Sequence, residues 1–258
     1  MPMKKIAIAG KGGSGKSTVA ALLARSLRDR GYRVLVVDSD ESNPGLYRTL
    51  GFDQRPEALL ELVGGKKKVF DAFSDSAGPS TSVLTQEEVR TSDLPPGYIL
   101  EQDKIKLVSI GKILQSLEGC ACPMGALSRE FLGRLTLDED EIAVIDMEAG
   151  VEHFGRGVET SVDTVLAVTE PSFDSLELAE KISTLAKEVG MESVWAVLNK
   201  VPSEEVASKL TTELKRRNVP VIGSIAYDPE AFEAGLEGRP VGDGLAKREI
   251  KEILDRLL

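Results

Sequence analysis

Short apolar runs alternate with longer amphipathic segments along most of the chain. The runs are typical of buried parallel strands, and apolar residues three and four positions apart predict helices between them. The predicted strands are residues 4–9, 33–38, 105–110, 142–146, 164–168, 194–198 and 219–225. The predicted helices begin at Lys16 and cover residues 125–135, 174–188, 203–217 and 244–257. This alternation predicts an α/β fold, a single domain over residues 1–258, with a mainly parallel sheet of seven to eight strands and helices on both faces.

Residues 63–104 interrupt the alternation. They contain Gly64-Gly65, the cationic run Lys66–Lys68, a cluster of Ser, Thr, Gly and Pro, and Pro95-Pro96. Glycine, proline and small polar residues favour turns and loops. We interpret this segment as an inserted loop or hairpin with little core, and the three lysines as a solvated tip.

Composition narrows the function classes. The chain has 258 residues, a formal net charge of −10 and two cysteines. The negative charge argues against nucleic-acid binding, which depends on cations that neutralise phosphates. No apolar run approaches the ~20 residues that cross a bilayer, the first residues lack the pattern of a signal peptide, and two cysteines do not make a disulfide scaffold. We expect a cytoplasmic protein that binds neither nucleic acid nor membrane.

A glycine-rich loop joins the first predicted strand to the first predicted helix. Residues 10–18 read Gly-Lys-Gly-Gly-Ser-Gly-Lys-Ser-Thr and match the phosphate-binding pattern G-x-x-x-x-G-K-[ST]. Backbone N–H groups of such a loop, together with the helix N-terminus, bind the phosphates of ATP. Lys16 supplies a positive charge to the β- and γ-phosphates, and the Ser17 hydroxyl ligates Mg²⁺. The other expected nucleotide-binding residues of this loop are Gly12, Gly13, Ser14, Gly15 and Thr18.

Carboxylates follow two of the predicted strands. Asp38 and Asp40 come after the second strand, where both can face the nucleotide if the chain leaves the extended state. Asp146 ends a buried strand and is the candidate that holds Mg²⁺, through a water molecule. The following residues 147–150 end in Gly150, which is free to pivot toward a γ-phosphate as switch loops do.

The two cysteines lie one residue apart, in Gly119-Cys-Ala-Cys-Pro-Met-Gly125. An isolated pair of this kind can be two small buried hydrophobic residues. Alternatively, a symmetric dimer would bring two copies of Cys120 and Cys122 to one axis. Four thiolates suit zinc in a tetrahedron and Ni(II) in a plane.

Lys11 gives the phosphate loop a particular form. The run K-G-G-x-G-K-[ST] resembles the deviant Walker A motif of the MinD/ParA/nitrogenase iron-protein group of NTPases. The resemblance implies a homodimer that encloses ATP, in which Lys11 acts catalytically at the partner's nucleotide. It also implies that Asp40 orients the attacking water and that Asp38 belongs to the switch I network.

The same resemblance also indicates which residues bind the nucleotide base. In related NTPases an asparagine at the position of Asn199 hydrogen-bonds the base, with Lys200 beside it. A guanine-specific N-K-x-D motif requires an acid at position 202, where this chain has Pro202. The pattern therefore favours adenine over guanine. The loop at residues 226–229 is a further candidate for the base pocket.

The deviant motif, the cysteine stretch and residues 146–157 together resemble the CooC-type ATPases. That family matures the nickel–iron centre of carbon monoxide dehydrogenase. The resemblance implies that Cys120 and Cys122 bind nickel or zinc at the dimer interface, coupled to hydrolysis of MgATP, and that carbon monoxide dehydrogenase is the client. His153 and Arg156 lie in the same region, and we assign neither as a metal ligand.

Three alternatives to this function stay open on the sequence. A MinD- or ParA-like partitioning ATPase would need a cationic membrane helix or a basic DNA-binding surface. The C-terminal segment 246–258 is amphipathic but mixed in charge, which favours a helix packed on the sheet. An iron–sulfur ATP-dependent reductase would use single cysteines far apart in sequence. A maturation ATPase for acetyl-CoA synthase cannot be separated from the first hypothesis.

Overall fold

The computed structural model describes residues 3–74, 84, 86–112, 122–151 and 158–258. Eight strands form one sheet in the order β3-β4-β2-β5-β1-β6-β7-β8, and each neighbouring pair is parallel except β3 with β4. The strands are Lys5–Gly10 (β1), Arg33–Ser39 (β2), Ile99–Gln102 (β3), Ile105–Ser109 (β4), Glu141–Met147 (β5), Thr164–Thr169 (β6), Val194–Val201 (β7) and Val221–Ala226 (β8). The predicted α/β fold with a mainly parallel sheet is confirmed.

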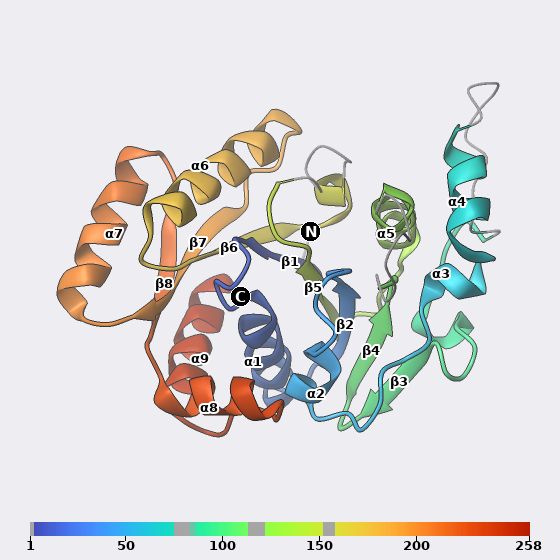
Figure 1. Ribbon diagram of the computed structural model, residues 1–258, viewed down its shortest axis with the longest axis horizontal. Helices are drawn as coiled ribbons and strands as arrows, with labels where there is room; N and C mark the ends of the chain where they lie inside the picture. The colour runs from blue at the N-terminus through green and yellow to red at the C-terminus, as the bar shows by residue number, and fades with distance from the viewer. Residues whose placement is uncertain (1–2, 75–83, 85, 113–121, 152–157) are drawn as a thin grey trace.

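Helices cover both faces of the sheet, as Figure 1 shows. One face carries α1, α2, α8 and α9, and the other carries α3 to α7. The α-helices are Lys16–Asp29 (α1), Leu46–Leu50 (α2), Leu59–Leu62 (α3), Gly65–Ser74 (α4), Cys122–Arg134 (α5), Phe173–Glu188 (α6), Glu204–Arg216 (α7), Pro229–Glu237 (α8) and Leu245–Leu257 (α9). Short 3₁₀ helices occur at Thr91–Asp93 (η1) and Val158–Ser161 (η3).

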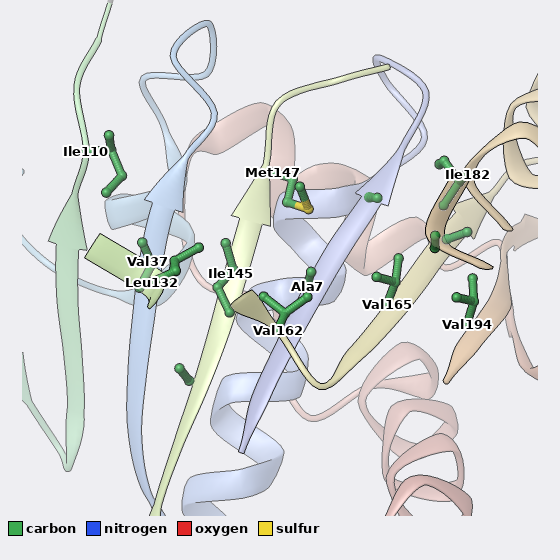
Figure 2. Packing of buried hydrophobic residues seen from close by; sticks show 14 of the residues in the cluster. Ala7, Val37, Ile110, Leu132, Ile145, Met147, Val162, Val165, Ile182 and Val194 are labelled. Atoms are coloured by element: carbon green, nitrogen blue, oxygen red, sulfur yellow. The ribbon is translucent and has the colours of Figure 1, made fainter. Parts of the chain in front are cut away.

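Each face of the sheet has its own hydrophobic core. Figure 2 shows the core on the α5–α6 side, where Ala7, Ile145 and Val165 of the central strands pack with Leu132 and Ile182 of the helices. Central strands of this kind are apolar on both faces, which explains why β1, β5 and β6 are continuous apolar runs in the sequence.

Outside residues 75–83 and 85, the segment 63–104 contains more regular secondary structure than the sequence predicted. Residues 66–68 are not a loop tip but belong to helix α4, where Val69 is fully buried. Val89 is also buried, so the segment contributes to the core on the α5–α6 side. The hairpin expectation holds for its end, since β3 pairs antiparallel with β4 through a turn at residues 103–104. Strand β3 of this segment therefore covers the β4 edge of the sheet.

Parallel strands place the functional residues at one edge of the sheet. Strands β1, β2, β5, β6 and β7 all end at the same side, where open α/β sheets bind ligands. Asp38 of β2 and Asp146 of β5 are paired in register, so their carboxyl groups are neighbours at this edge. Among the described helices, none is long and apolar enough to cross a bilayer.

Candidate functional site

The phosphate loop has a backbone that only glycine adopts readily. Gly10, Gly13 and Gly15 have φ values of 145°, 80° and 96°. A Cβ atom on Gly15 would lie 2.3 Å from Nδ2 of Asn199, so the loop has no room for a side chain there. Among the described residues, no side chain caps the N-terminus of α1, whereas Ser172 caps α6. The free N–H groups of α1 thus face the groove where phosphate binds.

A candidate magnesium position lies beneath this loop. The Ser17 hydroxyl donates a hydrogen bond to Oδ2 of Asp146 at 2.5 Å and accepts one from Nδ2 of Asn43 at 2.6 Å. Asp146 is fully buried, and its Oδ1 atom has no hydrogen-bond partner among the described residues. A hydroxyl and an unsatisfied carboxylate oxygen are hard donors that suit Mg²⁺. Asn43 was not predicted from the sequence.

The carboxyl group of Asp146 has a raised pKa. Burial raises its pKa to about 7, and the charges of Asp38 and Asp40 add to this effect while the hydrogen bond from Ser17 opposes it. A divalent cation next to the carboxylate would favour its ionised form. The site is therefore built to accept positive charge, and Ser17 and Asp146 fit the group that the sequence assigned to them.

Asp38 and Asp40 have different surroundings. Asp38 lies below the groove, where burial raises its pKa to about 6 despite an ion pair with Lys112 at 2.7 Å. Asp40 lines the phosphate groove, and its Oδ1 atom accepts hydrogen bonds from the N–H and hydroxyl of Ser42 and from the N–H of Asn43. The structure thus brings Asp40 to the groove and places Asp38 in a supporting position.

Three lysines approach this loop or its carboxylates. Lys16 is buried, and its Nζ atom lies 3.4 Å from the carbonyl oxygen of Lys11. Lys200 has a positive φ of 57° and donates a hydrogen bond to the carbonyl of Gly13 at 2.5 Å. The third, Lys112, forms an ion pair with Asp38 and was not predicted from the sequence, because a lysine after a strand resembles any surface lysine.

Lys11 points away from its own phosphate loop. Its Nζ atom lies 3.7 Å from Glu170 and 3.4 Å from Asp174, at the start of α6. All three side chains are partly exposed. Within its own chain Lys11 therefore forms ion pairs with these two carboxylates. Its expected role at a partner's nucleotide stays a prediction.

The base-binding candidates form one pocket beside the phosphate groove. Asn199 donates a hydrogen bond to the carbonyl of Ser14 at 2.7 Å, so it supports the phosphate loop as well as lining this pocket. Tyr227 and Phe232 line the pocket too, with ring centroids 6.4 Å apart. Thr18 completes the wall between the pocket and the groove. Flat aromatic rings beside a polar amide suit a planar base.

Several predicted residues lie outside the described part of the chain. Cys120, His153 and Arg156 are among them, and of Cys122 the structure gives its place as the first residue of α5. Gly150, four residues after Asp146, donates its N–H to the carbonyl of Gly10 at 3.3 Å. Residues 147–150, which the sequence predicts to act as a switch loop, thus contact the phosphate loop directly.

Comparisons with known proteins agree with this geometry. The profile of the CobQ/CobB/MinD/ParA nucleotide-binding domain matches residues 5–241. An uncharacterized ATP-binding protein of Methanocaldococcus jannaschii is 40% identical over 98% of this chain and 99% of its own. The carbon monoxide dehydrogenase accessory protein CooC of Rhodospirillum rubrum is 34% identical over 90% of this chain and 88% of its own. The structure of the septum site-determining protein MinD from Pyrococcus horikoshii with Mg-ADP superimposes with a TM-score of 0.72 at 19% identity, over 98% of this chain and 95% of that one.

Proposed function

Because the chain belongs to the CobQ/CobB/MinD/ParA family of nucleotide-binding proteins, we propose that it is an ATP-hydrolysing homodimer that carries nickel or zinc. In this proposal Cys120 and Cys122 hold the metal between two subunits, and the cargo is nickel for carbon monoxide dehydrogenase. The proposal rests on one observation: a chain with a complete phosphate-binding edge also carries a C-x-C pair and is 34% identical to a carbon monoxide dehydrogenase accessory protein.

The described residues support the nucleotide half of the proposal. The N–H groups of the phosphate loop and Nζ of Lys16 bind the phosphates, while Ser17 and Asp146 hold Mg²⁺. A Mg²⁺ ion held by Ser17 and Asp146 would supply positive charge that offsets the negative charge developing on the phosphates during transfer. Asp40 faces the same groove, where a fixed carboxylate orients the attacking water.

The position of Lys11 is compatible with the proposed dimer. Its two ion pairs with Glu170 and Asp174 are partly exposed, and pairs of this kind contribute only about 0–1 kcal/mol each. Lys11 can therefore exchange them for the triphosphate of a partner subunit at little cost. An extra cation of this sort accelerates phosphoryl transfer by about 10³–10⁵-fold.

The metal half of the proposal depends on symmetry. Each chain has two thiolates, and a two-fold axis combines them into a set of four, which suits nickel or zinc. If ATP and metal both favour the closed dimer, each must raise the affinity of the other. Hydrolysis then opens the dimer and releases the metal.

Nickel titration calorimetry tests the proposal. The wild-type chain is compared with the Cys120→Ala/Cys122→Ala variant, with and without a non-hydrolysable MgATP analogue. We expect the variant to lose nickel and zinc binding while its MgATP affinity stays unchanged, which shows that it is folded. Unchanged nickel affinity in the variant would refute the metal site. Activation of nickel-free carbon monoxide dehydrogenase, with acetyl-CoA synthase as the parallel assay, identifies the client.

A further inference from the structure

Lys112 connects the end of β4 to the loop that carries Asp40. Its side chain is 8% exposed, and its Nζ atom contacts three acceptors in that loop. They are Oδ1 of Asp38 at 2.7 Å, the carbonyl oxygen of Asn43 at 2.6 Å, and the carbonyl oxygen of Asp40. An ammonium group has three N–H donors, so this one loop accepts all of them.

We propose that Lys112 is the positioning residue that fixes residues 38–43 in the geometry needed for hydrolysis. This inference rests on the proposed ATPase function and assigns Lys112 no contact with the nucleotide. The loop holds Asp40, expected to orient water, and Asn43, which donates a hydrogen bond to the Mg²⁺ ligand Ser17. One cation therefore sets the place of both groups.

The sheet order explains how Lys112 reaches this loop. Strand β4 lies next to β2, with Ser109 paired to Asp38, and the N–H of Ile110 donates to the carbonyl of Asp38 at 3.0 Å. Gly111 follows, so that Lys112 leaves the strand beside the loop. Because Gly111 has no side chain, the backbone can pass close to α5 here: a Cβ atom on Gly111 would lie only 2.7 Å from the sulfur of Met124.

A simpler role for Lys112 would be to compensate the buried charge of Asp38. The two roles differ in which acceptors matter. Charge compensation depends on the carboxylate alone, whereas positioning depends also on the carbonyl oxygens of Asp40 and Asn43. Removing the Asp38 charge together with the lysine therefore separates them. Restored activity in the double variant indicates compensation, and persistent loss indicates positioning.

The experiment compares ATP turnover, MgATP affinity and melting temperature in five proteins. They are the wild type, Lys112→Met, Asp38→Asn, Asp38→Asn/Lys112→Met and the control Lys106→Met. Lys106 lies on β4 itself, and its Nζ atom donates a hydrogen bond to the hydroxyl of Thr91 at 2.7 Å. We expect kcat to fall about 100-fold in both Lys112 variants, because a displacement of ~1 Å at a reacting group has this effect. The MgATP Kd, measured at saturating Mg²⁺, should change less than about threefold. Asp38→Asn alone provides the reference for the double variant.

Three results overturn the inference: an unchanged kcat in Lys112→Met, recovery of kcat in the double variant to the level of Asp38→Asn, or an equal loss in Lys106→Met. If Lys112→Met does not fold, the double variant, which buries no unpaired carboxylate at this position, carries the comparison. A wild-type chain without ATPase activity would refute the proposed function instead. In that case Lys112 is tested by the Mg²⁺ concentration that ATP binding requires. Loss of the hydrogen bond between Asn43 and Ser17 should raise this concentration in Lys112→Met. An unchanged Mg²⁺ concentration would overturn the inference.

Discussion

Asp146→Asn should stabilise the magnesium-free protein while abolishing its response to Mg²⁺. The buried carboxyl group has a pKa of about 7, well above its ordinary value of 3.8. It therefore binds a proton more tightly in the folded than in the unfolded chain. Its contribution to stability is complete below about pH 4 and is lost as the pH rises toward 7. Asparagine keeps an oxygen that can accept the hydrogen bond of Ser17 and carries no charge.

The magnitude follows from the two proton affinities. For a pKa of about 7, the wild type loses about 1 kcal/mol of unfolding free energy between pH 6 and pH 8 through this group. A chain of this size changes its melting temperature by about 2–4 °C per kcal/mol, so the melting temperature of the variant minus that of the wild type should rise by roughly 2–4 °C from pH 6 to pH 8. With MgATP present the order reverses, because only the wild type binds the ion well.

Scanning calorimetry at pH 6 and pH 8, with EDTA or with MgATP, measures these differences. Asp53→Asn is the matched control, since Asp53 is exposed and lies away from the groove. The reasoning is refuted if Asp146→Asn melts below the wild type at pH 8 in EDTA. It is also refuted if the difference between the two proteins is the same at both pH values.

Further predictions concern the phosphate loop and its neighbours. Gly15→Ala should abolish ATP binding in equilibrium dialysis, because its Cβ would collide with Asn199 at 2.3 Å, while Gly190→Ala, also at a positive φ but in open space, should leave binding intact. Asn199→Ala should weaken ATP binding about tenfold, since it removes the hydrogen bond to the Ser14 carbonyl and leaves that acceptor buried; unchanged affinity in the same assay would contradict this role. Lys11→Ala should lower kcat by about 10³-fold with ATP affinity retained, and normal turnover would contradict action in trans.

Local patterns made the nucleotide edge predictable. The phosphate loop is continuous in sequence, and the strand before it and the helix after it are both strongly patterned, so Ser17 and Lys16 could be assigned directly. Asp146 was predictable because it ends an apolar run, and the end of a parallel strand is where ligands bind.

Other residues depend on contacts that the sequence does not reveal. Lys112 acquires its role only because β4 lies beside β2, an order that alternating strands and helices leave open. Asn43 reaches Ser17 through the fold of a loop with no periodic pattern. In helix α4, one deeply buried position, Val69, was hidden beside three lysines that suggested a solvated loop.

The stoichiometry of metal per dimer tests the central claim most directly. Sedimentation of the chain with nickel and a non-hydrolysable MgATP analogue, followed by elemental analysis of the sedimenting species, gives mass and metal content together. We predict a dimer with one nickel ion per two chains, and a metal-free species for Cys120→Ala/Cys122→Ala. A nickel-loaded monomer, or equal nickel in the variant, would contradict a site shared between subunits.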